Sequence, residues 1–239
     1  MATPQRIKSI VSNIERFNKN IAYISFKPES RVPRFKPGQF LHLALDNYDG
    51  ISEWPESRVF SIASPPKIKD TEISIIVSAK GPFTSRVVNS LKKNDIVWLK
   101  LPYGDFTIQE TEKTIVLVAG GTGIAPFVPF LEQAVYDNNN STIRLYYGVK
   151  NKNLIIFNKL LEKCIKSLSD FKSILFAENI EPPFNNMIKG IIDKEKIFND
   201  NKHNADYYLS GPLEMIMSLK DFFISKGVLN NNIHIDSWN

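Results

Sequence analysis

The stretch Val116-Leu117-Val118-Ala119-Gly120-Gly121-Thr122-Gly123-Ile124-Ala125-Pro126 decides the fold of the second half of the chain. Its apolar, partly β-branched beginning is typical of a buried parallel strand. The three glycines allow a sharp turn and keep side chains away from an approaching diphosphate. A helix that begins near Ile124 would offer free N–H groups and its positive dipole end to that anion, and the Thr122 hydroxyl is a further donor. Pro126 suits the first turn of such a helix.

This pattern predicts a nucleotide-binding turn, but the glycines alone also fit a tight turn that binds nothing. The spacing differs from the dinucleotide fingerprint G-x-G-x-x-G, and the acidic residue expected about 20 positions later has no clear counterpart. Tyr136-Asp137 lies in that range, at a predicted helix end. The hypothesis therefore needs support from the rest of the chain.

Length and composition predict two globular domains. The chain has 239 residues, 43% of them hydrophobic and 23% charged, which suits two domains of roughly 100 to 130 residues. We expect them at residues 1–108 and 109–239. No apolar run approaches the roughly 18 residues of a membrane span, and the N-terminus lacks the apolar centre of a signal peptide, so we expect a cytoplasmic protein. The net charge of +5 fits an acidic partner or a compositional bias, and we expect no nucleic-acid partner.

Cysteine and histidine usage argues against metal chemistry. Cys164 is the only cysteine, so this chain alone can form neither a disulfide nor a cysteine-ligated iron–sulfur cluster. It falls on an apolar helical face, which favours a core position over a nucleophile. The other members of that face are Phe157, Leu160, Leu161, Ile165 and Leu168. The histidines, His42, His203 and His234, show no ligand spacing, and we expect no protein-bound metal.

The first half of the chain is β-rich. Short apolar segments between Pro, Gly, Asn and Asp turns predict an antiparallel barrel of six strands. The strands are expected at Ile7–Ile14, Ile21–Phe26, Gln39–Leu45, Val59–Ala63, Ile73–Ser78 and Ile96–Leu101. One helix is expected among them, with Thr84 as its N-cap and with Val87, Val88 and Leu91 turned inward.

The second half alternates strands and helices. This rhythm predicts an α/β domain whose parallel sheet carries helices on both faces. Strands are expected at Thr114–Ala119, Ile143–Tyr147, Ser173–Ala177, Tyr207–Ser210 and Ile233–Asp236, and helices at Ile124–Tyr136, Leu154–Leu168 and Leu213–Lys226. An apolar stripe in the last helix predicts that Met217 lies in the core. That stripe is formed by Leu213, Ile216, Met217, Phe223 and Ile224.

A second candidate site lies in the β-rich half, at Arg58-Val59-Phe60-Ser61-Ile62-Ala63-Ser64. Arginine suits a phosphate, an aromatic side chain suits a flat ring, and serine can hydrogen-bond a ring nitrogen. The run Gly81-Pro82-Phe83-Thr84-Ser85 adds another glycine turn at a helix N-terminus, with two hydroxyl groups. Two phosphate-binding turns, one in each half, indicate two nucleotides that meet between the domains.

The order and spacing of these motifs resemble the ferredoxin–NADP reductase family. The matching motifs are Pro37-Gly38-Gln39-Phe40, Arg58-x-Phe60-Ser61-x-x-Ser64, Gly81-x-x-Thr84, Pro102-Tyr103-Gly104-Asp105-Phe106, the glycine turn through Pro126, Tyr147-Gly148 and Ser210-Gly211-Pro212-x-x-Met215. They span nearly the whole chain. The resemblance implies an FAD-binding antiparallel β-barrel, an NAD(P)-binding α/β domain and hydride transfer between nicotinamide and flavin N5.

The resemblance also implies a role for each matching residue. Arg58 would pair with the flavin phosphate, Phe60 would stack on the isoalloxazine and Ser61 would hydrogen-bond near N5. Ser61 and Ser210 are therefore the expected catalytic residues. The remaining implied contacts are Ser64, Gly81, Thr84 and Ser85 for FAD, Gly120, Gly121, Thr122, Gly123 and Pro126 for the NAD(P) diphosphate, and Gly211 and Pro212, with Ser210, for the nicotinamide.

The chain departs from the family pattern at three places. Phe60 stands where the family usually has Tyr, so stacking is kept and a hydroxyl contact is lost. Ser210 stands where the family usually has Cys, which would slow hydride transfer without abolishing it. Ala177-Glu178-Asn179-Ile180-Glu181 puts acid where many relatives hold the 2′-phosphate of NADP with arginine, which favours NADH. Lys150 and Lys152 in the adjacent loop could still bind a phosphate.

Relatives often end with an acidic residue and an aromatic that covers the other face of the flavin. Asp236 and Trp238 occupy the end of this chain. Trp238 would contact the flavin there or lie in a frayed tail.

These observations favour an FAD-dependent NAD(P)H reductase that passes single electrons to a separate acceptor. The acceptor would be a ferredoxin, a flavodoxin, an oxygenase component or a small molecule, and FMN in place of FAD is left open. Four lysines, Lys67, Lys69, Lys92 and Lys93, could steer an acidic carrier or simply form a solvated face. An alternative is a flavin- or nucleotide-binding subunit of a larger complex with little activity alone. A relative that has lost FAD is disfavoured by the intact Arg58, Ser61 and Gly81–Thr84.

Overall fold

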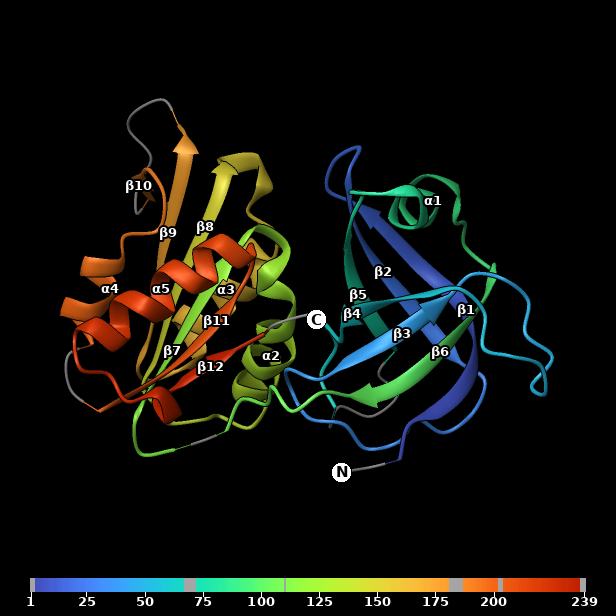
Figure 1. Cartoon of the computed structure of the whole chain (residues 1–239), viewed down its shortest axis with the longest axis horizontal. Coiled ribbons are helices and arrows are strands. Elements are labelled where there is room, and N and C mark those ends of the chain that lie inside the picture. Colours follow the sequence, from blue (N-terminus) through green and yellow to red (C-terminus); the bar gives the residue numbers. More distant parts are fainter. Residues whose placement is uncertain (1–2, 67–71, 110, 181–186, 202–203, 237–239) are drawn as a thin grey trace. The chain divides into compact units, whose positions relative to one another are not determined.

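The computed structural model describes residues 3–66, 72–109, 111–180, 187–201 and 204–236. The chain divides into two compact units, Met1–Thr107 with Ala125–Gln133, and Ile108–Ile124 with Ala134–Asn239. Each unit is built on its own six-stranded sheet (Figure 1).

The first unit is an antiparallel β-barrel. Its strands are β1 (Gln5–Arg16), β2 (Ile21–Pro28), β3 (Phe40–Ala44), β4 (Ser57–Ser61), β5 (Ile73–Ser78) and β6 (Ile96–Tyr103). They follow the order β4-β3-β6-β1-β2-β5, and every neighbouring pair is antiparallel. The two end strands meet through a single bridge between Ile62 and Ile75, so the barrel is nearly closed. The predicted barrel and its six strands are confirmed.

Alternating residues of these strands fill the barrel, since successive side chains of a strand point to opposite faces. Leu41 and Leu43 of β3 and Leu99 of β6 are fully buried. Helix α1 (Pro82–Ser90) adds Phe83, Val87 and Val88 to this core, as the apolar spacing predicted for the two valines. The predicted N-cap at Thr84 was wrong, because Pro82 takes the first helical position and Gly81 is the N-cap.

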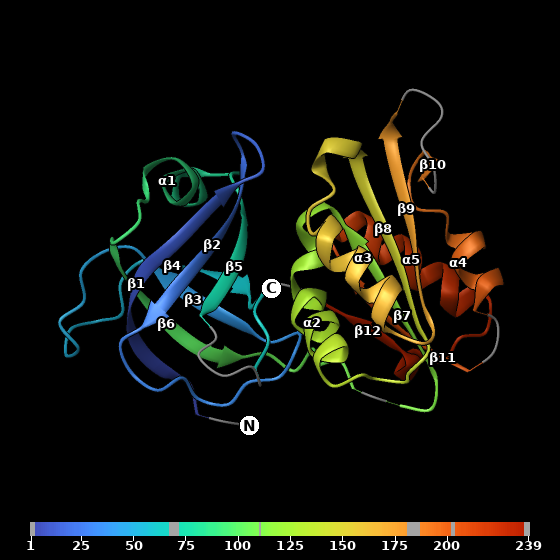
Figure 2. The same ribbon diagram turned by 180° about the vertical axis from the view of Figure 1, so that it is seen from behind.

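The second unit holds a parallel sheet. Its strands are β7 (Thr114–Gly120), β8 (Ile143–Asn151), β9 (Phe171–Asn179), β10 (Met187–Lys189), β11 (Ala205–Ser210) and β12 (Ile233–Ile235), in the order β10-β9-β8-β7-β11-β12. All five pairings are parallel. Helices α4 (Lys194–Asp200) and α5 (Leu213–Ser225) lie on one face and α3 (Asn158–Ser167) on the other (Figures 1 and 2). The predicted α/β fold is confirmed.

The helix after the glycine turn starts later than predicted. Residues Gly121–Phe127 form a 3₁₀ helix, and α2 covers Val128–Tyr136. Pro126 lies inside the 3₁₀ segment and not in the first α-helical turn. Because proline has no N–H to donate to the helical ladder, the regular helix forms only after it.

Four residues of the predicted apolar helix faces are exposed, among them Leu213 (65%) and Ile224 (43%). Met217 is 42% exposed and Ile165 is 56% exposed, whereas Cys164 is fully buried as predicted. In α5 the inward face is formed by Ile216, Leu219 and Phe223. The apolar stripe of α5 is thus wider than the surface that the sheet covers.

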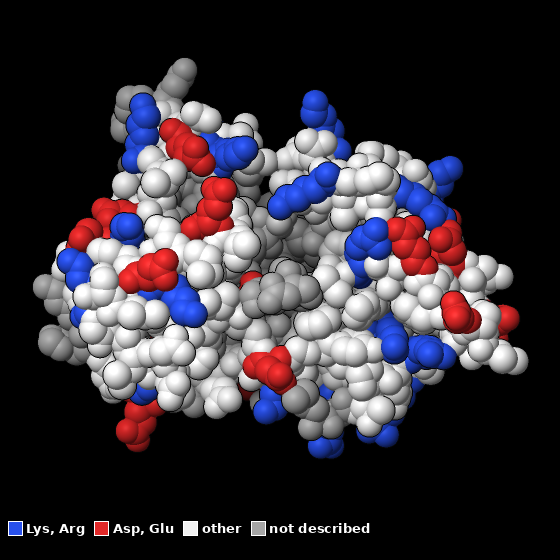
Figure 3. Space-filling view, in the orientation of Figure 1, with Lys and Arg blue, Asp and Glu red and all other residues white. Residues whose placement is uncertain are grey.

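Acidic and basic side chains are interspersed over the face seen in Figure 3, so no large area of one sign accompanies the net charge there. Of the four lysines considered for steering a carrier, Lys92 and Lys93 are exposed, and Lys67 and Lys69 lie outside the described residues.

None of the helices in the described part of the chain has both the length and the apolar character that crossing a bilayer requires. The described residues also contain no group of three or more His, Cys, Asp or Glu side chains placed to hold a metal ion.

Candidate functional site

The strand order of the second unit creates a crevice at one place. The chain proceeds from β7 outward through β8, β9 and β10, then returns to the other side of β7 with β11 and β12. In open parallel sheets, ligands bind outside the carboxyl ends of strands where the order reverses in this way. Ala119 of β7 pairs with Ser210 of β11, so the turns that follow these two strands lie side by side at the reversal.

Three glycines allow the turn after β7 and the turn after β11 to pack directly against each other. A Cβ on Gly123 would lie 2.4 Å from the carbonyl oxygen of Ser210, and one on Gly120 would lie 2.8 Å from the Met215 sulfur. A Cβ on Gly211 would meet Met215 at 2.8 Å and the Gly120 backbone at 3.0 Å. Three of the glycines are therefore required by contacts within the chain itself, an explanation that the sequence did not suggest.

Gly121 differs from its neighbours. It has a φ of +56°, and a Cβ placed on it would meet no atom of the described part of the chain within 4 Å. Glycine is favoured there by backbone conformation, and the space above it is open. The four residues Gly120–Gly123 of the predicted diphosphate turn are half-buried, whereas Pro126 is buried.

Ser210, the predicted nicotinamide-site residue, is 2% exposed. Its hydroxyl donates to Asp236 Oδ2 at 2.9 Å. Burial raises the pKa of Asp236 to about 7, and the hydrogen bond from Ser210 opposes this rise. Asp236 is therefore poised to exchange a proton near neutral pH beside the predicted nicotinamide site. Trp238 lies outside the described residues.

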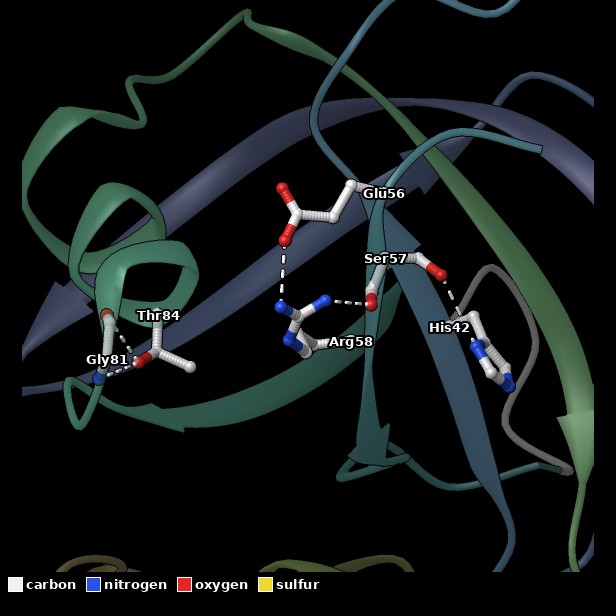
Figure 4. Close-up of polar contacts among 6 residues, drawn as sticks. All are labelled: His42, Glu56, Ser57, Arg58, Gly81 and Thr84. Atoms are coloured by element: carbon white, nitrogen blue, oxygen red, sulfur yellow. Dashed lines mark hydrogen bonds and ion pairs between the residues drawn. The ribbon is translucent and has the colours of Figure 1, made fainter. Parts of the chain in front are cut away.

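In the first unit, Arg58 and the start of α1 come together. Figure 4 shows the Arg58 side chain directed from β4 toward the N-terminus of α1. Its guanidinium carbon lies 5.3 Å from the centroid of the Phe83 ring. The first helical hydrogen bond runs from Ser85 N to Gly81 O at 2.8 Å, so the N–H groups of Phe83 and Thr84 have no acceptor within the helix. These donors and the guanidinium make a site suited to an anion.

Gly81 leaves space beside these donors. Its backbone is extended, with φ −156°, and no atom of the described residues lies within 4 Å of a Cβ built on it. Neither conformation nor packing within the chain calls for glycine here. The Thr84 hydroxyl accepts from Gly81 N at 3.0 Å and Lys80 N at 2.9 Å and donates to Gly81 O at 3.1 Å, so it fixes the turn rather than facing the open space (Figure 4).

The other predicted flavin residues lie on or just after β4. Phe60 is 9% exposed and packs with the barrel core. Ser61, at the end of β4, is 8% exposed, and its hydroxyl has no hydrogen-bond partner among the described residues. Ser64 is 2% exposed, and its hydroxyl accepts from Ser74 N at 3.1 Å. Ser61 is thus available to a ligand, whereas Ser64 already stabilises the start of β5.

The predicted coenzyme-discriminating residue lies at the carboxyl edge of the second sheet. Glu178 is exposed near the end of β9. Lys189 of β10 pairs with the adjacent Ala177, and Lys150 lies near the end of β8. This edge therefore carries both the acidic Glu178 and two lysines. Glu181 lies outside the described residues.

The donor chemistry of both units fits the expected nucleotides. The first unit combines a guanidinium, free helix N–H groups and an open glycine, which is the donor set of a diphosphate site. The second unit combines an open, left-handed glycine with a helix start at the strand-order reversal. Each unit thus offers donors suited to a diphosphate on its own residues.

Three contacts of predicted motif residues could not be read from the sequence motifs. Glu56 accepts from Arg58, Asp236 accepts from Ser210, and Ile192 lies 2.6 Å from a Cβ built on Gly148. Only the first pair had a local signal, an acid two residues before the arginine. The other two pairs join segments distant in the sequence.

Both parts of the chain match domain families of known proteins. An FAD-binding domain family model matches residues 7–145, and an oxidoreductase NAD-binding domain model matches residues 117–221. The toluate 1,2-dioxygenase electron transfer component of Pseudomonas putida is 25% identical over 236 residues, 97% of this chain and 67% of the relative. The NAD(P)H-flavin reductase of Vibrio harveyi is 26% identical over 227 residues, 91% of each. The chain spans 61–67% of the length of three dioxygenase components that it matches.

A solved structure shares the fold over the whole chain. The flavohem-like FAD/NAD binding domain of nitric oxide dioxygenase from Vibrio cholerae matches with a TM-score of 0.83 at 19% identity, covering 97% of this chain and 98% of that one. With the first family model covering more than half of the chain, the chain belongs to the FAD-binding domain family and is an FAD/NAD(P) oxidoreductase of the ferredoxin–NADP reductase type.

Proposed function

We propose that this protein takes a hydride from NAD(P)H onto FAD and passes the electrons singly to a separate acceptor. The observation that carries this proposal is that each unit has its own open glycine, Gly81 and Gly121, beside helix-start N–H groups. FAD, when bound, supplies the conversion from two-electron to one-electron chemistry. The names of the relatives support an oxygenase component as the acceptor, and ferredoxin or flavodoxin would serve the same role.

Each side chain has a proposed task. Arg58 and the α1 N–H groups hold the flavin diphosphate, and Phe60 supports the isoalloxazine. The Ser61 hydroxyl, which has no partner in the described part of the chain, hydrogen-bonds near N5. In the second unit, Gly121 and Thr122 hold the coenzyme diphosphate. The proposed division is residues 1–108 for FAD and 109–239 for NAD(P).

Ser210, Gly211 and Pro212 line the proposed nicotinamide site. The hydrogen bond from Ser210 to Asp236 fixes the serine rotamer, and Asp236 holds a proton at this place because burial raises its pKa. Orientation of the coenzyme is the main contribution of these residues to the rate.

We further propose that NADH is preferred over NADPH. The exposed Glu178 near the end of β9 would accept hydrogen bonds from a free ribose 2′-OH and repel a 2′-phosphate. Lys150 and Lys189 near the same edge limit this preference, because they attract a phosphate.

The test is the visible spectrum of the purified protein, loaded with FAD under anaerobic conditions, before and after NADH or NADPH is added. We expect a bound flavin whose absorption bleaches faster with NADH. A bound flavin that neither coenzyme bleaches would overturn the reductase function and favour a subunit of a larger complex. A protein that cannot be loaded with FAD would refute flavin chemistry altogether.

A further inference from the structure

The arginine expected to hold the flavin phosphate already has an anionic partner. Arg58 Nη2 donates to Glu56 Oε1 at 2.8 Å, and Arg58 Nη1 donates to the Ser57 carbonyl oxygen at 2.8 Å (Figure 4). The same guanidinium lies over the Phe83 ring. A flavin phosphate that pairs with Arg58 would therefore displace the Glu56 carboxylate or share the guanidinium with it.

Another arginine, Arg86 on α1, also pairs with a carboxylate. Arg86 Nη2 donates to Asp46 Oδ1 at 2.5 Å, and this hydrogen bond holds the pKa of Asp46 below its usual value. Glu56 also contributes to the field at Arg86. Asp46 and Glu56 lie at the two ends of the connection between β3 and β4, so one loop brings two carboxylates to two arginines.

The Arg58–Glu56 pair is placed to be exchanged rather than to be permanent. The Arg58 and Glu56 side chains are 52% and 57% exposed, and exposed ion pairs contribute little to stability. Release of Glu56 into water is therefore easy. A diphosphate offers Arg58 more acceptor oxygens than one carboxylate does, and the free N–H groups of α1 bind it at the same time.

We propose that Glu56 is a built-in competitor of the flavin phosphate, and that it sets how tightly the chain holds its flavin. This inference rests on the proposed flavin role of Arg58. Without flavin, the Glu56 carboxylate neutralises Arg58. With flavin, Glu56 is displaced and remains near the diphosphate as a like charge. Both effects weaken the binding of flavins that carry phosphate, and neither acts on riboflavin, which carries none.

The test measures flavin affinity directly, by fluorescence titration of the flavin-free full chain with FAD, FMN and riboflavin. We expect Glu56→Gln to tighten FAD and FMN about fivefold, the upper end of what an exposed pair is worth, and to leave riboflavin unchanged. The gain should shrink at high salt, since exposed charges are screened. Glu53→Gln is the matched control, because Glu53 lies in the same loop, is exposed and makes no ion pair with a described residue.

Three outcomes would overturn the inference. One is an unchanged FAD affinity in Glu56→Gln, another is an equal gain in Glu53→Gln, and the third is an equal gain for riboflavin. If the wild-type chain binds FAD and NADH bleaches it while Glu56→Gln changes nothing, the inference alone fails. If the wild-type chain binds no flavin, the proposed function fails with it.

Discussion

Two glycine turns that lead into helices look alike in the sequence and differ in the structure. In the turn of Gly120–Gly123, two of the three glycines abut the segment after β11, with Cβ positions 2.4 to 2.8 Å from its atoms. At Gly81, before α1, a Cβ would meet nothing within 4 Å among the residues that the structure describes. A glycine can thus make room for the chain itself or for a ligand. Only the second kind marks a binding surface directly.

The largest expected effect is a loss of stability when a methyl group is added to Gly123, where the turn after β7 contacts β11. Gly123→Ala would push a methyl group against the Ser210 carbonyl, and neither backbone can move without disturbing β7 or β11. We expect a loss of about 3 kcal/mol in the free energy of unfolding, measured by urea denaturation.

Gly121→Ala is the matched control for this change, since no atom of a described residue lies within 4 Å of its Cβ. Its left-handed φ of +56° costs about 1 kcal/mol for alanine. Equal losses in the two variants would show that contact across the turns is not what fixes Gly123.

The next largest effect is the pH dependence of stability that comes from Asp236. Asp236 has its pKa raised by burial to about 7, above the value of the unfolded chain. The folded state therefore holds a proton that the unfolded state loses between about pH 4 and pH 7, so stability falls as pH rises through this window and levels off above it. Asp236→Asn should remove the part of this fall that lies between pH 5 and pH 8, roughly 2 to 3 kcal/mol for about two pH units.

This prediction is checked by urea denaturation of both proteins at pH 5 and pH 8. The difference between them isolates Asp236 from the other titrating groups. A variant whose stability changes with pH as much as that of the wild type would show that Asp236 is ionised in the folded protein at pH 5.

A third substitution, Gly81→Ala, tests whether Gly81 leaves room for a ligand and not for the chain itself. The methyl group of Gly81→Ala meets no described atom within 4 Å, and alanine accepts the extended φ, so we expect a free energy of unfolding within about 0.5 kcal/mol of the wild type. FAD affinity should fall about tenfold, or 1.4 kcal/mol, because the methyl group occupies the space for the diphosphate. An unchanged affinity would mean that the flavin does not approach Gly81.

The smallest effect is expected at the open edge of the second sheet. Glu178→Gln removes an exposed charge and should raise the kcat/KM ratio of NADPH to NADH about fivefold, close to 1 kcal/mol. Lys172→Gln, a change of an exposed residue in the same strand, is the control. Because Lys172→Gln changes the net charge in the opposite direction, a ratio that falls in this control by as much as it rises in Glu178→Gln would assign the effect to net charge alone.

The fold was largely predictable because its signals are local. Each strand of the barrel carries alternating apolar residues, and all six were found. The parallel strands of the second unit were found as well, apart from the three-residue β10, which is too short for a periodic pattern. The helix α4 was missed for the same reason, since it has only 7 residues.

The site was predictable as a set of motifs and not as a set of contacts. The resemblance predicted Ser210 and Gly123 but not their contact, because the pairing of β7 with β11 joins residues about 90 positions apart in the sequence. Met217 was assigned to the core because helical spacing shows which residues are apolar and not how much of α5 the sheet covers. The roles of individual flavin contacts stay predictions.

The single bridge that joins β4 to β5 has a consequence for the flavin-free chain. Among the described residues, no strand pairs with the outer edge of β4 before Ile62, and an unpaired edge can recruit a strand of another molecule. Arg58 and Glu56 place two exposed charges beside this edge. Glu56, the proposed competitor of the flavin phosphate, and Arg58 would therefore also disfavour pairing of this edge with a strand of another molecule while the flavin is absent.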